Sequence, residues 1–94
     1  MNSPKDFLEE PDLLEQLAEE ASELSHAAIK LARHKRGKNP TGRSELELVR
    51  NLTEELSDVL LCAVQLPYRP DWDIMDTKKH RWLERLFQFS KKDE

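Results

Sequence analysis

The chain has 94 residues, which is enough for a single domain with one hydrophobic core. Charged residues make up 36% of the chain and the formal net charge is -4, so the basic excess that general nucleic-acid binders need is missing. Cys62 is the only cysteine, which excludes an internal disulfide, and no stretch approaches the roughly 20 apolar residues of a membrane span. We therefore expect one cytoplasmic domain over residues 1–94, with neither a nucleic acid polymer nor a membrane among its partners.

The N-terminal part of the sequence predicts a short turn followed by a long helix. Ser3 is placed to cap a helical turn that opens with Pro4, and this turn occupies the first ten residues. The first long helix is predicted to begin at Pro11 and to run to about Arg36. Its acidic start and basic end suit the helix dipole, and Gly37 supplies the left-handed residue that ends it.

A polar, turn-rich loop over residues 37–43 separates this helix from a second long one. Ser44 and Glu47 have the spacing of a capping box, which places the start of the second helix at Ser44. We predict that this helix runs to Leu66, because Pro67 follows directly and cannot continue it.

A third helix is predicted to begin after a cap at Asp71 or Asp73 and to run to about Lys91. Residues 92–94 are expected to fray. No segment shows the alternation of a strand. The sequence therefore predicts an all-α protein, an antiparallel helical bundle with two long helices plus a C-terminal helix.

At about 100° per residue, each long helix has an apolar side and a stripe of acidic residues beside it. The predicted apolar side of the first helix comprises Leu14, Leu17, Ala21, Leu24, Ala28, Leu31 and Ala32. That of the second comprises Leu48, Val49, Leu52, Leu56, Val59, Leu60 and Ala63. The stripes comprise Gln16, Glu20, Glu23, Ala27 and Lys30 on the first helix, and Asn51, Glu55, Asp58 and Cys62 on the second.

Two carboxylates three positions apart lie on one side of a helical turn, where they repel each other and lose solvation beside the apolar side. A divalent cation relieves both effects, and Mg²⁺ prefers carboxylate and phosphate oxygens. Either acidic pair alone is a common pattern of a solvated helix. Their repetition at one angle from the apolar side of two helices indicates a metal site. The predicted ligands are Glu20, Glu23, Glu55 and Asp58.

Three charged residues near these ligands have open roles. Glu19 and Glu54 each precede an acidic residue of a stripe and point about 100° away from it. Three roles are open to each of them: to orient a metal ligand, to act as a general base, or to be an ordinary surface residue. Lys30 lies two turns beyond Glu23, where it could bind the end of a phosphate chain or extend beside the apolar side.

The two acidic segments resemble a known signature. Residues 19–24 (EEASEL) followed by residues 54–61 (EELSDVLL) resemble the E-E-x-x-E … E-x-x-D pattern of MazG-like nucleotide pyrophosphohydrolases, in the all-alpha NTP pyrophosphatase superfamily. The resemblance covers residues 11–66, and residues 76–86 are similar to the last helix of short phage-type members. The loop before Ser44 lengthens the distance between the motifs, and Cys62 stands where many relatives carry tyrosine, so any contact with a base or sugar there differs.

The resemblance implies Mg²⁺-dependent hydrolysis of (deoxy)nucleoside triphosphates to the monophosphate and pyrophosphate, in nucleotide-pool cleaning, with Mn²⁺ as a substitute ion. The implied metal ligands are Glu20, Glu23, Glu55 and Asp58. Lys30 with Lys78 or Arg81 would hold phosphates. The carboxylate that takes a proton from the attacking water would be Glu20, Glu23 or Glu19.

The width of the apolar sides predicts assembly. Each spans about 160°, wider than the roughly 100° stripe of an ordinary surface helix. A monomer would leave about half of it in water. We therefore expect a homodimer in which the long helices of two chains form a four-helix core, or a homotetramer, as the resemblance also implies.

Two other functions fit parts of the pattern. Glu23 and His26 form an E-x-x-H pair like that of di-iron carboxylate bundles, but His26 lies about 120° from Glu20 and Asp58 would have no role. The other is a non-enzymatic helical interaction module. In either case the two tryptophans, at positions 72 and 82, are more typical of a core or an interface than of a base contact.

Overall fold

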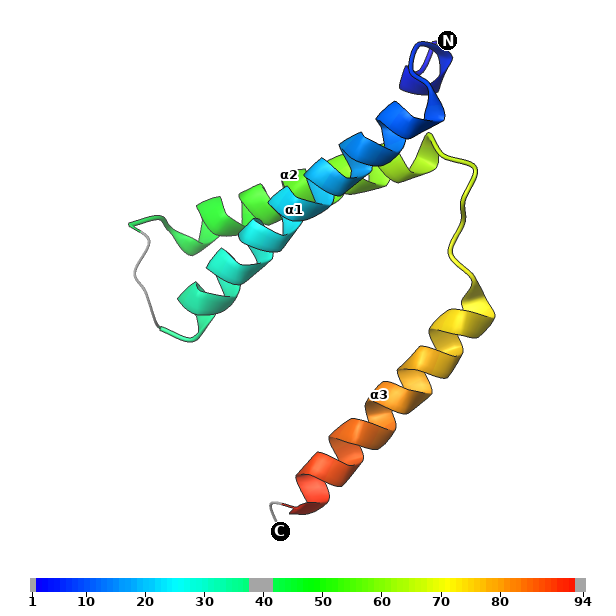
Figure 1. Ribbon diagram of the computed structural model, residues 1–94. Helices are drawn as coiled ribbons and strands as arrows, with labels where there is room; N and C mark the ends of the chain where they lie inside the picture. Colours follow the sequence, from blue (N-terminus) through cyan, green and yellow to red (C-terminus); the bar gives the residue numbers. More distant parts are fainter. Residues whose placement is uncertain (1, 38–41, 93–94) are drawn as a thin grey trace.

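The computed structural model describes residues 2–37 and 42–92, and in these ranges the chain forms helices and no strand. The elements in chain order are a single 3-10 turn η1 (Pro4–Asp6) and the helices α1 (Glu10–Lys35), α2 (Glu45–Val64) and α3 (Trp72–Lys92) (Figure 1). This confirms the all-α prediction with two long helices plus a C-terminal helix. Residues 93–94 and part of the predicted 37–43 loop lie outside the described residues.

Local hydrogen bonds explain where the helices begin and end. The Ser44 hydroxyl oxygen accepts from the backbone N–H of Glu47 at 3.2 Å, as expected for the start of α2. An oxygen of Asp71 accepts from the backbone N–H groups at positions 73 and 74, which makes Asp71, and not Asp73, the cap of α3. Gly37 follows α1 with a φ of 71°, the left-handed conformation predicted for it.

The predicted end of α2 is wrong by two residues. The helix ends at Val64 and not at Leu66, because the N–H groups of Gln65 and Leu66 bond to the carbonyls three residues before them. These bonds close a tighter turn directly before Pro67, which cannot donate a hydrogen bond to continue the helix.

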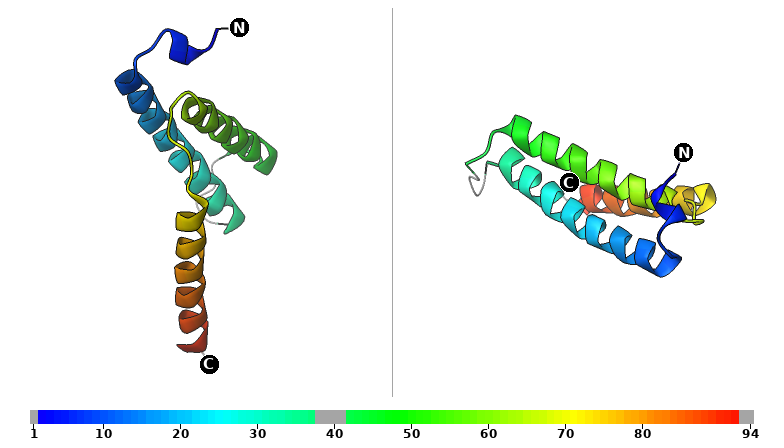
Figure 2. Two further views of the ribbon diagram at one scale, coloured as in Figure 1. Left: turned by 90° about the vertical axis from the view of Figure 1, so that its right-hand side faces the viewer. Right: turned by 90° about the horizontal axis from the view of Figure 1, so that it is seen from above.

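Helices α1 and α2 lie side by side and run in opposite directions, as an α-helical hairpin (Figures 1 and 2). At the loop end, the Lys35 ammonium lies 3.4 Å from the Glu45 carboxylate. At the other end, the Tyr68 hydroxyl donates to the Glu10 carboxylate. Both pairs are exposed, so they contribute little to the stability of the hairpin and serve mainly to fix the alignment of the two helices.

The hairpin is held by one narrow seam. The buried side chains of the described residues are Leu13, Ala27, Leu48 and Leu66. Half-buried residues complete the seam at alternating spacings of three and four, as in a coiled coil: Leu17, Glu20, Leu24 and Leu31 on α1, and Leu52, Glu55, Val59 and Cys62 on α2. Two of the predicted metal ligands are therefore part of the helix–helix contact.

This seam corrects the predicted apolar sides. Ala27, predicted in the acidic stripe, is 1% exposed, whereas Leu14, on the predicted apolar side, is 42% exposed. On α2, Leu56 and Leu60 are likewise exposed. Two helices in contact bury only a stripe, and here that stripe runs along the acidic edge of each apolar side. The rest of each apolar side faces away, on the surface of the hairpin opposite the acidic stripes.

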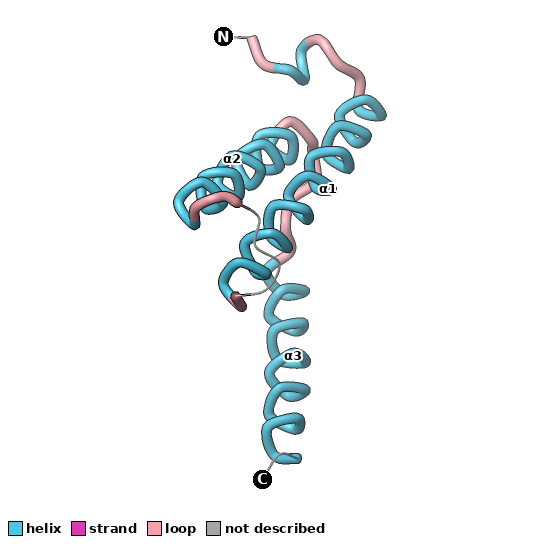
Figure 3. The backbone as a smooth tube through the Cα atoms, turned by 90° about the vertical axis from the view of Figure 1, so that its left-hand side faces the viewer, coloured by secondary structure: helices cyan, strands magenta, loops and turns pink. Residues whose placement is uncertain are grey.

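Helix α3 projects from the hairpin and has no extensive contact with α1 or α2 (Figures 1 and 3). The molecule is accordingly open. Its radius of gyration is 17.7 Å, against about 12 Å for a compact chain of this length. Its accessible surface is 8187 Å², against about 5600 Å² for a compact monomer of this mass. None of the described helices has the length and apolar character that crossing a membrane would require.

Candidate functional site

Three carboxylates from the two helices of the hairpin converge at the middle of the seam. Glu20 of α1 and Glu55 and Asp58 of α2 each offer an oxygen, and these oxygens all lie within 4.8 Å of one another. Glu20 and Glu55 are half-buried and Asp58 is exposed, so the cluster opens toward solvent on the acidic side of the hairpin. Within the described residues it is the one group of three or more potential metal-ligating side chains.

The seam and a neighbouring amide position these carboxylates. Residues 20 and 55 both belong to the half-buried seam, so the packing of α1 against α2 brings a carboxylate oxygen of each within 4.8 Å of the other. The Gln16 side-chain amide donates to a Glu20 carboxylate oxygen at 2.9 Å, one turn earlier on α1. Asp58 lies three positions after Glu55 and therefore on the same side of α2.

The surroundings of the three carboxylates disfavour their negative charge. The pKa of Glu55 is raised, first by its partial burial in the seam and then by the negative charges of Asp58, Glu23, Glu20 and Glu54. In the described part of the chain, no basic side chain forms an ion pair with Glu20, Glu55 or Asp58. The cluster is therefore a group of carboxylates that a cation would stabilise.

A pocket of about 280 Å³ adjoins two of the carboxylates. The side chains that line it are Pro4, Leu8, Leu13, Gln16, Glu20, Asp58, Leu61, Cys62 and Gln65. Its walls are thus mainly apolar, with carboxylates and amides at a few places, which is the usual composition of a small-molecule site. No pattern in the sequence marks Leu8 as a site residue; it lines the pocket because the segment after η1 lies beside the end of α2, where the Lys5 backbone N–H donates to the Gln65 side-chain oxygen. The position of Gln16, four residues before Glu20 and therefore one helical turn away, does mark it in the sequence as a neighbour of the cluster.

The other acidic and basic residues predicted on α1 lie near the cluster but outside it. Glu23 is exposed and close enough for its charge to raise the pKa of Glu55. Glu19 is exposed and points away from the seam. Lys30 is exposed on the same side as Glu23, about 10 Å further along the helix by its two-turn separation.

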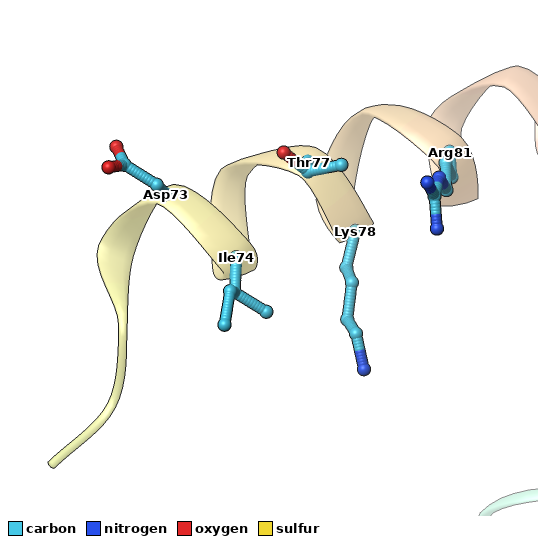
Figure 4. A pocket seen from close by; sticks show the side chains of 5 residues that line it. All are labelled: Asp73, Ile74, Thr77, Lys78 and Arg81. Atoms are coloured by element: carbon cyan, nitrogen blue, oxygen red, sulfur yellow. The ribbon is translucent and has the colours of Figure 1, made fainter.

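The predicted phosphate-binding residues of α3 are not brought to the cluster of their own chain. Lys78 and Arg81 line a shallow hollow on α3 together with Ile74, Asp73 and Thr77. Figure 4 shows Ile74 and Lys78 projecting from one side of α3, with Arg81 about one turn further along. Since α3 projects away from the hairpin, Lys78 and Arg81 lie apart from the three carboxylates.

The remaining residues with chemical potential are His26 and Cys62. His26 is exposed on α1 and is not a member of the carboxylate cluster. Cys62 lines the pocket, and the pKa of its thiol is raised by burial and then by the charges of Glu20 and Asp58. The thiol is therefore neutral near physiological pH and is not an activated nucleophile.

Comparison of the chain with known protein families, with characterised proteins and with solved structures gives no match. The observations that bear on function are therefore the carboxylate cluster, the pocket beside it and the signature in the sequence.

Glu55→Gln is expected to stabilise the hairpin at neutral pH in the presence of a chelator, because it removes one charge from the repelling cluster. A raised pKa in the folded state means that folding favours the protonated form. The wild-type protein should therefore lose stability as the pH rises from the ordinary glutamate pKa through the raised value, and Glu55→Gln should lose less. Thermal melts at several pH values measure this difference.

Glu15→Gln is the matched control, because it removes the same charge from an exposed position of α1 away from the seam. Equal pH dependence of Glu55→Gln and wild type would contradict the electrostatic account of the cluster.

Proposed function

We propose that the protein is a Mg²⁺-dependent nucleoside triphosphate pyrophosphohydrolase of the MazG-like kind, acting in cytoplasmic nucleotide-pool cleaning. The convergence of Glu20, Glu55 and Asp58 beside a mainly apolar pocket carries the proposal. Glu20 comes from one motif segment of the resemblance, residues 19–24, and Glu55 and Asp58 come from the other, residues 54–61, although these segments are far apart in the chain.

The donors of the cluster suit a hard divalent cation. They are carboxylate oxygens only, which Mg²⁺ prefers and Mn²⁺ also accepts. Glu20, Glu55 and Asp58 would hold the ion, with Glu23 beside them as the fourth predicted ligand. When bound, the ion neutralises phosphate oxygens and lowers the pKa of a coordinated water.

The pocket supplies a place for the nucleoside. Its volume of about 280 Å³ is just below the roughly 300–1,000 Å³ of typical small-molecule sites, and suits a nucleoside better than a whole nucleoside triphosphate. Leu8, Leu13 and Leu61 would contact the faces of a base, while Gln16 offers an amide near its edge. The phosphates would then extend over the carboxylates toward Lys30 on the acidic side of the hairpin.

The attacking water needs a carboxylate that accepts its proton. Glu20 is held by the Gln16 amide and faces the cluster, whereas Glu19 and Glu23 are exposed beside it. The proposal assigns this role to one of these three residues. Attack at the α-phosphorus then releases the nucleoside monophosphate and pyrophosphate.

The protein should hydrolyse one or more common or damaged nucleoside triphosphates in the presence of Mg²⁺, releasing pyrophosphate and not orthophosphate. Asp58→Asn should lower turnover at least 100-fold, because it removes a charged oxygen donor and leaves the fold intact. Glu47→Gln, on an exposed turn of the same helix, is the control and should leave turnover unchanged. Pyrophosphate release measured across a panel of nucleotides reports both effects. If no nucleotide of the panel is hydrolysed with either Mg²⁺ or Mn²⁺, the proposed enzymatic activity is refuted.

A non-enzymatic interaction module is the second candidate, and the exposure of apolar side chains on both the hairpin and α3 favours it. Such a module would be indifferent to Mg²⁺ and would turn over no nucleotide. The nucleotide panel therefore separates the two functions.

We further propose that the protein is a homodimer with a four-helix core, which can double to a homotetramer. The apolar side chains that the seam leaves exposed gather on the surface of the hairpin opposite the acidic side. They include Leu14, Val49, Leu56, Leu60 and Val64. The excess of accessible surface over that of a compact monomer is about 2600 Å² per chain, or about 5200 Å² for two chains, which is at the upper end of what obligate dimers bury in total.

Light scattering at low micromolar concentration should give at least twice the monomer mass of 11.0 kDa. Leu56→Glu should shift the protein toward the monomer, because it places a charge in the proposed core while leaving the seam intact. A wild-type protein that is a stable, folded monomer at this concentration would contradict the dimer.

A further inference from the structure

The N-terminal segment, residues 3–8, keeps its shape through hydrogen bonds within itself. The Ser3 backbone N–H donates to an Asp6 carboxylate oxygen at 2.8 Å, and the N–H groups of residues 6, 7 and 8 donate to the carbonyls of residues 3 and 4 at 2.9–3.0 Å. The segment crosses from the start of α1 toward the end of α2 (Figure 2). There the Lys5 backbone N–H donates to the Gln65 side-chain oxygen at 3.2 Å. Gln65 therefore fixes where this preformed turn lies against the hairpin.

The same segment forms the wall of the pocket that lies farthest from the carboxylates. The lining on α2 extends from Asp58 to Gln65, seven positions or about 10 Å along the helix. Pro4 and Leu8 also line the pocket, and the hydrogen bond to Gln65 places their segment at that end. A nucleoside whose phosphates lie at the carboxylates therefore has its base against Pro4 and Leu8.

This wall offers a base apolar contact, because its polar groups are already bonded. Pro4 has no N–H, and the N–H groups of residues 5–8 all donate within the protein. The Gln65 side-chain oxygen accepts from Lys5, and its nitrogen donates to the Leu61 carbonyl at 3.3 Å. The wall therefore does not present these groups to the edge of a base.

Strong rejection of a wrong base requires a buried polar group that the wrong base leaves unpaired. Among the residues that the structure describes, every buried side-chain nitrogen and oxygen has a partner. Gln16, the amide proposed near the edge of the base, is exposed, so water can replace any contact that a base does not make. A misfit in size at an apolar wall changes the rate about 10- to 200-fold, and an apolar pocket rejects an isosteric base by no more than about 100-fold. Size is therefore the property that this pocket can read.

We propose that the N-terminal segment selects the base of the substrate by its size and not by its hydrogen-bonding groups. Leu8 contacts the base, and Gln65 is a positioning residue that holds the segment in place. The substrates are then nucleoside triphosphates whose bases fit by size, including bases altered in their exocyclic groups. This selection rests on the proposed function and extends it, because a pool-cleaning enzyme has to accept altered bases.

Leu8→Ala tests the wall directly. It removes three carbons, so the ratio of kcat/KM for dATP and dGTP to that for dCTP and dTTP should rise about tenfold, because the wider pocket favours two-ring bases. Phe7→Ala is the matched control, since Phe7 belongs to the same segment but is 74% exposed and does not line the pocket. It should leave the ratio unchanged. Equal ratios in the two variants would overturn the role of Leu8.

A comparison of dCTP with dUTP tests selection by size in the wild-type protein. The two bases are nearly equal in size and differ in the hydrogen-bonding groups of one edge. Their kcat/KM values should lie within about 100-fold of each other. A larger difference would show that a polar group reads the base, and would overturn the inference.

Gln65→Met tests the positioning role, because it keeps the size of the side chain and removes the oxygen that Lys5 bonds. Hydrogen exchange at the Lys5 N–H should become faster. The KM should rise about tenfold with kcat unchanged, since the carboxylates remain in place and only binding of the base is weakened. Unchanged exchange, or an unchanged KM, would overturn this role of Gln65.

Failure of this selection and failure of the proposed function give different results. If no nucleotide is hydrolysed by the wild-type protein, both are overturned. If nucleotides are hydrolysed, and Leu8→Ala changes kcat/KM by one common factor for one-ring and two-ring bases, selection by the N-terminal segment alone is overturned.

Discussion

The contact between α1 and α2 along one narrow seam is the constraint on which the rest of the structure depends. Two helices can bury only one stripe each, and this stripe includes Glu20 and Glu55 at its centre. Apolar residues at these positions would stabilise the hairpin more, because carboxylates that face each other lose solvation and repel. Charged residues at positions that packing would make apolar are expected where a functional site, and not stability, determines which side chain is present. The charge of this cluster is therefore the physical basis of the proposed metal site.

The same seam decides what remains on the surface. By using the acidic edge of each apolar side, it leaves side chains such as Leu56 and Leu60 exposed on the opposite side of the hairpin. Helix α3, held outward by the contacts of Tyr68 and Arg69, adds a second exposed apolar surface. An open chain of this size buries a smaller share of its surface than a compact domain of the same mass does. The proposed dimer covers part of this exposed surface and leaves the acidic side of the hairpin available to a ligand.

Much of this fold could be predicted from local sequence signals. The helices begin and end within one or two residues of the predicted positions, because Asp71, Ser44 and Gly37 act through hydrogen bonds and backbone preferences that depend only on their neighbours. The pairing of Glu20 with Glu55 also followed from the matching stripes. The exact seam could not be predicted, since an apolar arc of about 160° does not say which part of it a partner helix will cover. Nor could the outward path of α3, which depends on contacts between Tyr68 and a helix far away in the sequence.

The central claim is that the carboxylate cluster holds a divalent cation. The most direct test is to titrate the metal-free protein with Mn²⁺, without nucleotide, and to follow the free ion by electron paramagnetic resonance. The account predicts saturable binding that competes with Mg²⁺, is lost in Glu20→Gln and is retained in the exposed control Glu9→Gln. Binding that does not saturate, or that is equally strong in both variants, would show that the cluster is an ordinary acidic surface and would contradict the account.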